Sequence, residues 1–222
     1  MNAEKSTLNK QRIVIIGGAG NGMVFAQVIL DMQKSGHPLI LEGFLNDHHA
    51  CGEMLGEWPV LGKPADWNEL DDDIQFVFAL LTVGKMEERA ELLHSLAIPL
   101  NRMATLVHPS AMVGFDTQIG KGSVICSHAS IQPGARIGNN TIVRAGANVG
   151  HDVTLSDCID IGPNVTLCGF SSVKDGAHVA ANSVVRDSIT VGPYAVIGAG
   201  SVILKDADSR TTWLGNPARR VK

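Results

Sequence analysis

Aliphatic residues recur at every sixth position through the second half of the chain, without an insertion. The run begins at Val107 and ends at Ile203, and all seventeen positions in phase carry valine, isoleucine or leucine. The positions four residues further on are small or β-branched, as at Ala129 and Ala147. A period of six matches neither an α-helix, at about 3.6, nor a single strand, at about 2. The pattern therefore predicts a repeated unit of one short strand and one tight turn.

Three such units complete one coil, and successive coils stack as parallel strands about 4.8 Å apart. Glycine and asparagine supply positive φ at the turns. A narrow interior also explains the composition, since the chain has 24 glycines and only 5% aromatic residues. The repeat resembles the hexapeptide left-handed parallel β-helix, with about six coils, and the handedness is taken from that resemblance.

The first half has a different pattern, in which short apolar runs alternate with helical stretches. This alternation predicts a Rossmann-like α/β domain with a parallel sheet. We expect a domain at residues 1–105 and a β-helix domain with a C-terminal tail at 106–222. The tail at 213–220 reads as a short loop leaving the solenoid. The predicted strands are 11–16, 38–45 and 74–81, and the predicted helices are 23–34 and 85–96.

Composition excludes several classes of protein. The 222 residues are 45% hydrophobic and 18% charged, so a core can form and intrinsic disorder is not expected. The apolar run at 76–81 is much shorter than the roughly 18 residues of a membrane helix. No hydrophobic segment follows the polar start Met1–Lys10, so no signal peptide is expected. A net charge of −4 argues against nucleic-acid binding. Four cysteines without CxxC spacing indicate reduced thiols in a cytoplasm.

A glycine-rich turn, Gly17–Gly22, connects the first strand to the first helix. Its backbone N–H groups can face a phosphate or a ribose, although a plain tight turn is the alternative. Met23 stands where the third glycine of a dinucleotide fingerprint belongs, which argues against full dinucleotide binding. Asp47 follows the second strand, where its carboxylate can accept a hydrogen bond from a sugar or a nucleobase. The alternative is that Asp47 is a solvated acid in a loop.

Candidate chemistry in the repeat centres on His151, which is followed by Asp152 in a turn. A histidine beside a carboxylate can act as an oriented base, although a surface corner histidine is the alternative. A step of one full coil along the chain places Gly169 next to His151, and a backbone N–H there suits a developing oxyanion. No histidine pair has metal-binding spacing, so no metal is expected. Cys126 and Cys168 are expected to be inert.

Several motifs in order resemble bacterial nucleotide-sugar N-acetyltransferases that acylate 4-amino-4,6-dideoxyhexoses, and the related sialic acid O-acetyltransferases. The resemblance covers nearly the whole chain. Its carriers are Gly17–Gly22, Phe44–Asp47, His108–Ala111, His151–Asp152, Gly162–Pro163, Leu167–Gly169, Gly198–Val202 and Gly215–Ala218.

The resemblance implies a homotrimer that binds acetyl-CoA between neighbouring solenoids and a nucleotide-linked amino sugar on the N-terminal domain. It implies that His151 is the general base and that Asp152 orients it. It also implies that the N–H of Gly169 donates to the thioester carbonyl. It places Ala181 along the CoA arm. The substrate positions that it implies are Ala19, Gly20, Asn21, Asn46 and Asp47.

Three positions depart from the family pattern. Asn21 and Asp160 stand where histidines are frequent, and Leu80–Thr82 replaces an Ile-Gly-Asn segment. The expected activity is direct N-acetylation of a nucleotide-linked 4-amino-4,6-dideoxy sugar, without an acyl-enzyme. The alternatives are a sugar O-acetyltransferase and a non-catalytic solenoid that binds a nucleotide sugar. The residues do not distinguish UDP, dTDP or GDP, nor the stereochemistry of the sugar.

Overall fold

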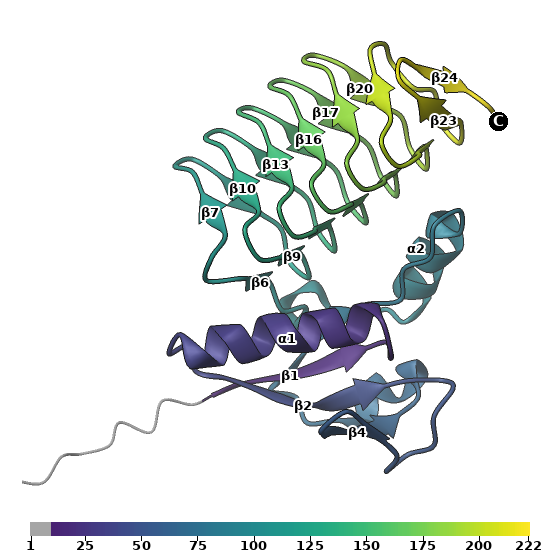
Figure 1. Cartoon of the computed structure of the whole chain (residues 1–222). Helices are drawn as coiled ribbons and strands as arrows, with labels where there is room; N and C mark the ends of the chain where they lie inside the picture. Colours follow the sequence, from purple (N-terminus) through teal and green to yellow (C-terminus); the bar gives the residue numbers. More distant parts are fainter. Residues whose placement is uncertain (1–9) are drawn as a thin grey trace, which may run out of the picture.

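A computed structural model of the chain describes residues 10–222, in which an α/β layer is joined to a three-sided solenoid (Figure 1). The polar start Met1–Lys10, on which the expectation of no signal peptide rests, lies outside the described residues except for Lys10. No helix within 10–222 is long and apolar enough to cross a bilayer.

The α/β layer is built on a five-stranded sheet with the order β3-β4-β2-β1-β5. Strands β1, β2, β4 and β5 are parallel, and β3 pairs antiparallel with β4. The elements are β1 (Gln11–Ile16), α1 (Asn21–Lys34), β2 (Leu39–Leu45), β3 (Met54–Leu55), β4 (Trp58–Gly62), η1 (Pro64–Glu69), β5 (Ile74–Phe78), α2 (Met86–Ser95) and η2 (Leu100–Arg102).

Strand β1 is apolar on both sides because the sheet is covered on both faces. Ile13 and Ile15 pack in one cluster with Phe25 of α1, while Ile16 packs in another with Leu93 of α2. The two helices and three of the strands, β1, β2 and β5, lie where the sequence predicted them. The third predicted strand ends at Phe78 rather than Leu81, because its partner β1 ends at Ile16, which pairs with Phe78.

Strands β3 and β4, which add to the edge of the sheet beside β2, were not predicted from the sequence. Both are short and β4 contains Pro59, so neither shows a clear alternation of apolar and polar residues. Gly43 makes the pairing possible, since a Cβ there would lie 2.3 Å from the carbonyl oxygen of Pro59.

The solenoid confirms the period of six. Each aliphatic position is the second residue of a two-residue strand, and strands one coil apart pair in parallel. The strands are β6 (Leu106–Val107), β7 (Met112–Val113), β8 (Gln118–Ile119), β9 (Val124–Ile125), β10 (Ser130–Ile131), β11 (Arg136–Ile137), β12 (Ile142–Val143), β13 (Asn148–Val149), β14 (Thr154–Leu155), β15 (Asp160–Ile161), β16 (Thr166–Leu167), β17 (Ser172–Val173), β18 (His178–Val179), β19 (Val184–Val185), β20 (Thr190–Val191), β21 (Val196–Ile197) and β22 (Val202–Ile203).

Positive φ recurs every six residues at the corners, from Asp116 to Gly200. Glycine and asparagine occupy many of these corners, as predicted, but His128 and Phe170 also adopt this conformation. The glycines that directly follow the aliphatic positions have another function. A Cβ at Gly162, for example, would lie 2.6 Å from the backbone nitrogen of Ala181 in the next coil.

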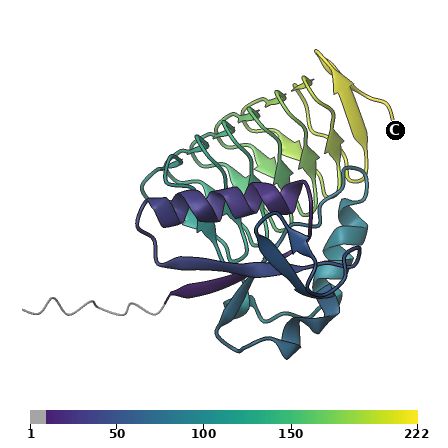
Figure 2. The same ribbon diagram turned by 60° about the horizontal axis from the view of Figure 1, so that its bottom comes forward.

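The strands form three sheets, and three edges separate them. We call the sheet that contains β6, β9, β12, β15, β18 and β21 the domain-facing sheet, because its Leu106 and Ile142 share a core with Ala26 and Val28 of α1. Helix α1 lies between the α/β sheet and the solenoid (Figure 1) and runs along the coils (Figure 2).

The C-terminal tail is not the loop that the sequence suggested. Strands β23 (Thr212–Gly215) and β24 (Ala218–Arg220) form an antiparallel hairpin, and β23 adds to the domain-facing sheet beside β21. Trp213 is buried against the end of the solenoid core. The hairpin thus covers the last coil, whose apolar end would otherwise contact water.

Candidate functional site

Three loops converge at the carboxyl ends of β1, β2 and β5. Ile16 pairs with both Leu45 and Phe78, so the segments that follow these residues leave the sheet at the same edge. In open parallel sheets this edge is where ligands bind. The structure therefore brings together the glycine-rich turn and Asn46–Asp47, as the sequence predicted.

The glycine-rich turn leads directly into α1. Gly20, with φ +84°, precedes the first helical residue, and no side chain caps the helix N-terminus. Ala19 and Gly20 are exposed. The first N–H groups of α1 are thus available to an anionic or polar ligand, which is the geometry of phosphate-binding turns.

Asn46 and Asp47 have different environments. Asn46 is buried, and its Nδ2 donates to the Gly17 carbonyl over 3.0 Å while its Oδ1 accepts from the His48 N–H over 2.7 Å. Its side chain therefore holds the start of the glycine-rich turn in place. Asp47 is exposed at the rim of the turn, where its carboxylate is accessible to a ligand.

Asn21 connects the turn to the solenoid. Its Oδ1 accepts from Nη1 of Arg144 over 2.9 Å, and its Nδ2 reaches the Leu81 carbonyl at 3.4 Å. Arg144 directly follows β12 of the domain-facing sheet. The predicted substrate turn thus lies over this sheet.

Arg144 belongs to a buried group of three charged or titratable side chains. Its Nε and Nη2 donate to the two carboxylate oxygens of Asp160 over 2.7 and 3.1 Å, and Nδ1 of His178 lies 3.1 Å from the same carboxylate. Burial opposes ionisation of Asp160, but the hydrogen bonds from His178 and Arg144 outweigh it and lower the pKa of that carboxyl.

The role of Asp160 was left open by the sequence, and neither of its two partners was predicted. The spacing carried a usable signal for one of them, because Asp160 and His178 are one coil apart and so stack directly on neighbouring strands. The contact with Arg144 also spans two neighbouring strands of this sheet.

His151 and Asp152 lie on another edge of the solenoid. We call this the His151 edge, formed by residues 115–116, 133–134, 151–152, 169–170 and 187–188. Nδ1 of His151 lies 3.0 Å from Oδ2 of Asp152, which fixes the tautomer with Nε2 as the free acceptor. The two side chains are 52% and 51% exposed. The ring of Phe170 packs edge-on against the imidazole, with centroids 4.9 Å apart.

Gly169 lies beside the imidazole, as the coil length predicted. A Cβ at this position would be 2.5 Å from His151 Nε2. The Gly169 N–H donates to no acceptor within residues 10–222, whereas the next N–H, of Phe170, donates to the His151 carbonyl over 3.1 Å. The arrangement offers a base nitrogen and a free N–H donor side by side, which is what addition to a carbonyl requires.

Ala181 lies on a third edge, which we call the α1 edge, formed by residues 127–128, 145–146, 163–164, 181–182 and 199–200. The structure therefore does not bring Ala181 next to Gly169 within one chain. The His151 edge also lies between the two sheets that face away from α1 and the glycine-rich turn. Within one chain, His151 and that turn therefore lie on different sides of the solenoid.

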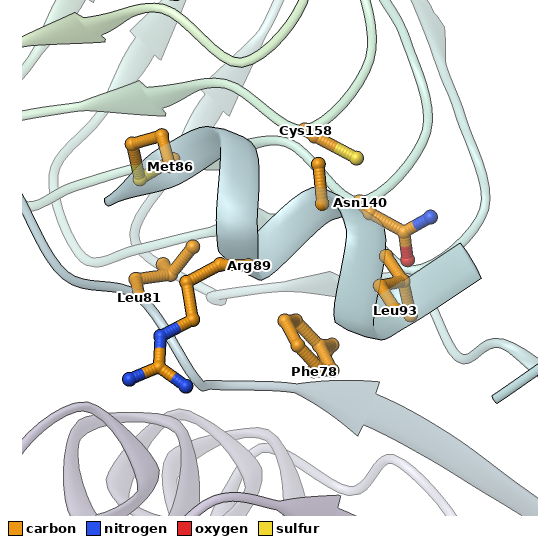
Figure 3. A pocket seen from close by; sticks show the side chains of 8 residues that line it. Phe78, Leu81, Met86, Arg89, Leu93, Asn140 and Cys158 are labelled. Atoms are coloured by element: carbon orange, nitrogen blue, oxygen red, sulfur yellow. The ribbon is translucent and has the colours of Figure 1, made fainter. Parts of the chain in front are cut away.

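One further pocket is too small to bind a substrate. A pocket between α2 and the solenoid is lined by Arg89 and Asn140 (Figure 3), whose Nε and Oδ1 atoms have no hydrogen-bond partner among the described residues. Its free volume of about 10 Å³ is no more than one water molecule needs. No group of three His, Cys, Asp or Glu side chains among residues 10–222 is placed to hold a metal ion.

Residues 116–151 and 170–205 match the family described as bacterial transferase hexapeptide, six repeats. The two matched stretches lie in the solenoid and cover less than half of the chain, which shares the six-residue repeat of these transferases. Its solenoid is the left-handed parallel β-helix that the sequence predicted.

A curated relative, UDP-N-acetylbacillosamine N-acetyltransferase from Bacillus subtilis strain 168, is 35% identical over 115 residues. The match covers 52% of this chain and 51% of the relative, so the chain spans about half the length of that protein.

Solved structures resemble the chain over almost its whole length. The acetyltransferase domain of PglB from Neisseria gonorrhoeae FA1090, also solved with acetyl coenzyme A, is 28% identical, with a TM-score of 0.83 over 96% of this chain and all of that one. PerB from Caulobacter crescentus, in complex with CoA and GDP-perosamine, is 25% identical, with a TM-score of 0.78 over 95% and 97%. The predicted resemblance to nucleotide-sugar N-acetyltransferases is thereby confirmed.

Proposed function

We propose that the protein is an acetyl-CoA-dependent N-acetyltransferase that acylates the amine of a nucleotide-linked 4-amino-4,6-dideoxy sugar. The observation that carries the proposal is the position of His151 Nε2 beside Gly169, where a Cβ would not fit, with Asp152 on the other ring nitrogen. The PglB domain and PerB, which were solved with acetyl coenzyme A and with CoA and GDP-perosamine, support the choice of substrates.

The proposed reaction is a direct attack. The amine nitrogen forms a bond to the thioester carbonyl carbon while His151 Nε2 takes the amine proton. The Gly169 N–H donates to the carbonyl oxygen as negative charge develops on it. The C–S bond then breaks, and the CoA thiolate can receive the proton from His151. Asp152 keeps Nδ1 protonated throughout and so holds Nε2 ready as the acceptor.

Binding of the nucleotide sugar is assigned to residues 1–105, and acetyl transfer to residues 106–222. In this proposal the backbone of Ala19, Gly20 and Asn21 faces the substrate, Asp47 accepts from it, and Asn46 holds the turn in shape. Ala181 lines the CoA arm on the α1 edge.

We further propose a homotrimer in which the His151 edge of one chain meets the glycine-rich turn of the next. This edge carries exposed apolar side chains, with Phe115 81% and Phe170 61% exposed. Exposed aromatic residues along one edge are typical of a protein interface. The arrangement would unite the two halves of the site that one chain keeps apart.

The test is release of CoA thiol from acetyl-CoA across a panel of UDP-, dTDP- and GDP-linked 4-amino-4,6-dideoxy sugars. Thiol release that depends on one of these sugars supports the proposal, and mass spectrometry of the product should show an added acetyl group. Release with no sugar of the panel, but with a hydroxyl-bearing sugar such as a sialic acid, would contradict it.

A further inference from the structure

A cavity of about 320 Å³ lies between α1 and the α1 edge of the solenoid. Its walls are largely apolar and include Val24 and Val28 of α1 together with Ala145 and Pro163. Arg144 also lines it, next to the glycine-rich turn that its Nη1 contacts through Asn21. Apolar walls with a few convergent polar groups are typical of a small-molecule site.

Arg144 has donors to offer into this cavity. A guanidinium carries five N–H groups. Two of them bond Asp160 and one bonds Asn21, so within residues 10–222 one N–H on each of Nη1 and Nη2 has no acceptor. The side chain is only 18% exposed, and Asp160 holds one edge of the guanidinium through two hydrogen bonds. The two remaining donors therefore have fixed directions.

The charges around the cavity indicate which kind of ligand oxygen these donors suit. Asp160 already compensates the charge of Arg144. At the other end of the cavity, hydrogen bonds from Gln27, His108 and Lys34 lower the pKa of Asp31 to about 2, so that its carboxylate stays negative. Lys34 and His108 pair with that carboxylate in turn, so neither Arg144 nor Asp31 presents an uncompensated charge to a ligand. The walls and donors together suit a neutral ring with hydroxyl groups and an apolar face.

We propose that this cavity binds the pyranose ring of the acceptor sugar, that Arg144 donates hydrogen bonds to its hydroxyl oxygens, and that Asp160 and His178 are positioning residues for Arg144. The inference rests on the proposed function, because the nucleotide is taken to lie on the glycine-rich turn beside the cavity. Pro163 and Ala181 occupy successive coils of the same edge, so the ring would lie next to the predicted CoA arm.

The experiment is isothermal titration calorimetry of each variant with a nucleotide diphosphate alone and with the corresponding 4-amino sugar conjugate, without acetyl-CoA. Arg144→Lys keeps a cation beside Asp160 but loses the fork of donors. It should weaken binding of the sugar conjugate about 10- to 100-fold, since charge-assisted hydrogen bonds are lost. Binding of the nucleotide diphosphate should stay within about twofold, and the thermal midpoint should confirm folding.

A second variant tests the cavity without touching the charges. Ala145→Leu adds apolar volume to its wall and should also weaken the sugar conjugate selectively. The matched control is Arg210→Lys, because Arg210 likewise links the two halves of the chain, through Glu87 of α2, but does not line this cavity. It should bind both ligands as the wild type does.

Positioning by Asp160 has its own readout. Asp160→Asn keeps the shape of the carboxylate but weakens the clamp on Arg144, so the KM for the sugar should rise while the KM for acetyl-CoA does not. A wild-type chain that binds the sugar conjugate, with Arg144→Lys and Ala145→Leu binding it equally well, overturns this inference and leaves the proposed function standing. A wild-type chain that binds no conjugate of the panel overturns both.

Discussion

His151 lies at a corner of the solenoid where a single side chain has three distinct neighbours. Asp152 fixes the proton on one nitrogen, Gly169 lies against the other, and Phe170 packs against the ring. The positive φ of Asp152, at 58°, places the carboxylate directly beside the imidazole of the preceding residue. These contacts fix the orientation of the imidazole, although the side chain remains about half exposed.

Replacing His151 by Asn should therefore lower kcat by about 10^2–10^4-fold, because a positioned base is lost. The KM values should change little, since the ring is proposed to act in the transition state. Asp152→Asn should cost less, because it removes orientation and leaves the acceptor. Steady-state kinetics with acetyl-CoA and the best sugar of the panel measures both.

The matched control for His151 is His94→Asn, another exposed histidine, which lies in the last turn of α2 and on neither the His151 edge nor the α1 edge. It should leave kcat unchanged. Near-native turnover of His151→Asn at neutral pH would show that the base lies elsewhere.

Asp47 and Asn46 are neighbours with separable effects. Asp47→Ala should raise the KM of the nucleotide sugar well above that of acetyl-CoA, because the exposed carboxylate is proposed to contact only the sugar substrate. Asn46→Ala should in addition lower the thermal midpoint, since the Gly17 carbonyl and the His48 N–H lose a buried partner. Equal KM changes for both substrates in Asp47→Ala would remove Asp47 from the site.

Among the elements, the coils of the solenoid all share the geometry of the hexapeptide repeat. Only the two ends of the solenoid need additional elements to cover them. β6 begins the solenoid against α1, and the β23–β24 hairpin covers its other end. Trp213 is the large side chain that fills this end, and its Nε1 donates to Thr211 Oγ1 over 2.9 Å.

Trp213→Ala should therefore destabilise the chain by about 3–5 kcal/mol, the usual cost of removing a large buried aromatic side chain. Chemical denaturation followed by circular dichroism measures the change. Leu214→Ala is the control, because its side chain is 46% exposed, and it should cost much less. Equal losses in the two variants would contradict a capping function for Trp213.

At the scale of the whole molecule, the two halves of the proposed site lie on opposite sides of one chain. The glycine-rich turn covers the domain-facing sheet, whereas His151 stands on the edge opposite that sheet. In a cyclic trimer each site would take its turn from one chain and its base from the next.

Subunit mixing tests this arrangement. His151→Asn and Asp47→Ala chains, each impaired alone, should regain about one quarter of wild-type activity when refolded together in equal amounts, because a random trimer forms intact pairs at that frequency. Sedimentation should give a trimer for the wild type and for the mixture. A mixture no more active than its components would place both halves of the site within one chain.

The features that repeat follow from the order of amino acids alone. Because the repeat unit has a constant length, the size of a coil, the pairing of strands one coil apart and the neighbourhood of His151 and Gly169 all follow from one period. Buried strands flanked by turn residues likewise located β1, β2 and β5 and brought the glycine-rich turn to Asp47.

Contacts between parts that do not repeat arise instead from the way the two halves of the chain pack against each other. The angle at which α1 docks on the solenoid, which no local period encodes, brings Asn21 to Arg144 and opens the cavity between them. In the same contact, Asp160 is buried and accepts two hydrogen bonds from the guanidinium of Arg144, while His178 bonds to Asp160. Packing between distant segments depends on the shapes of whole surfaces, and so it cannot be read from the spacing of residues along either one.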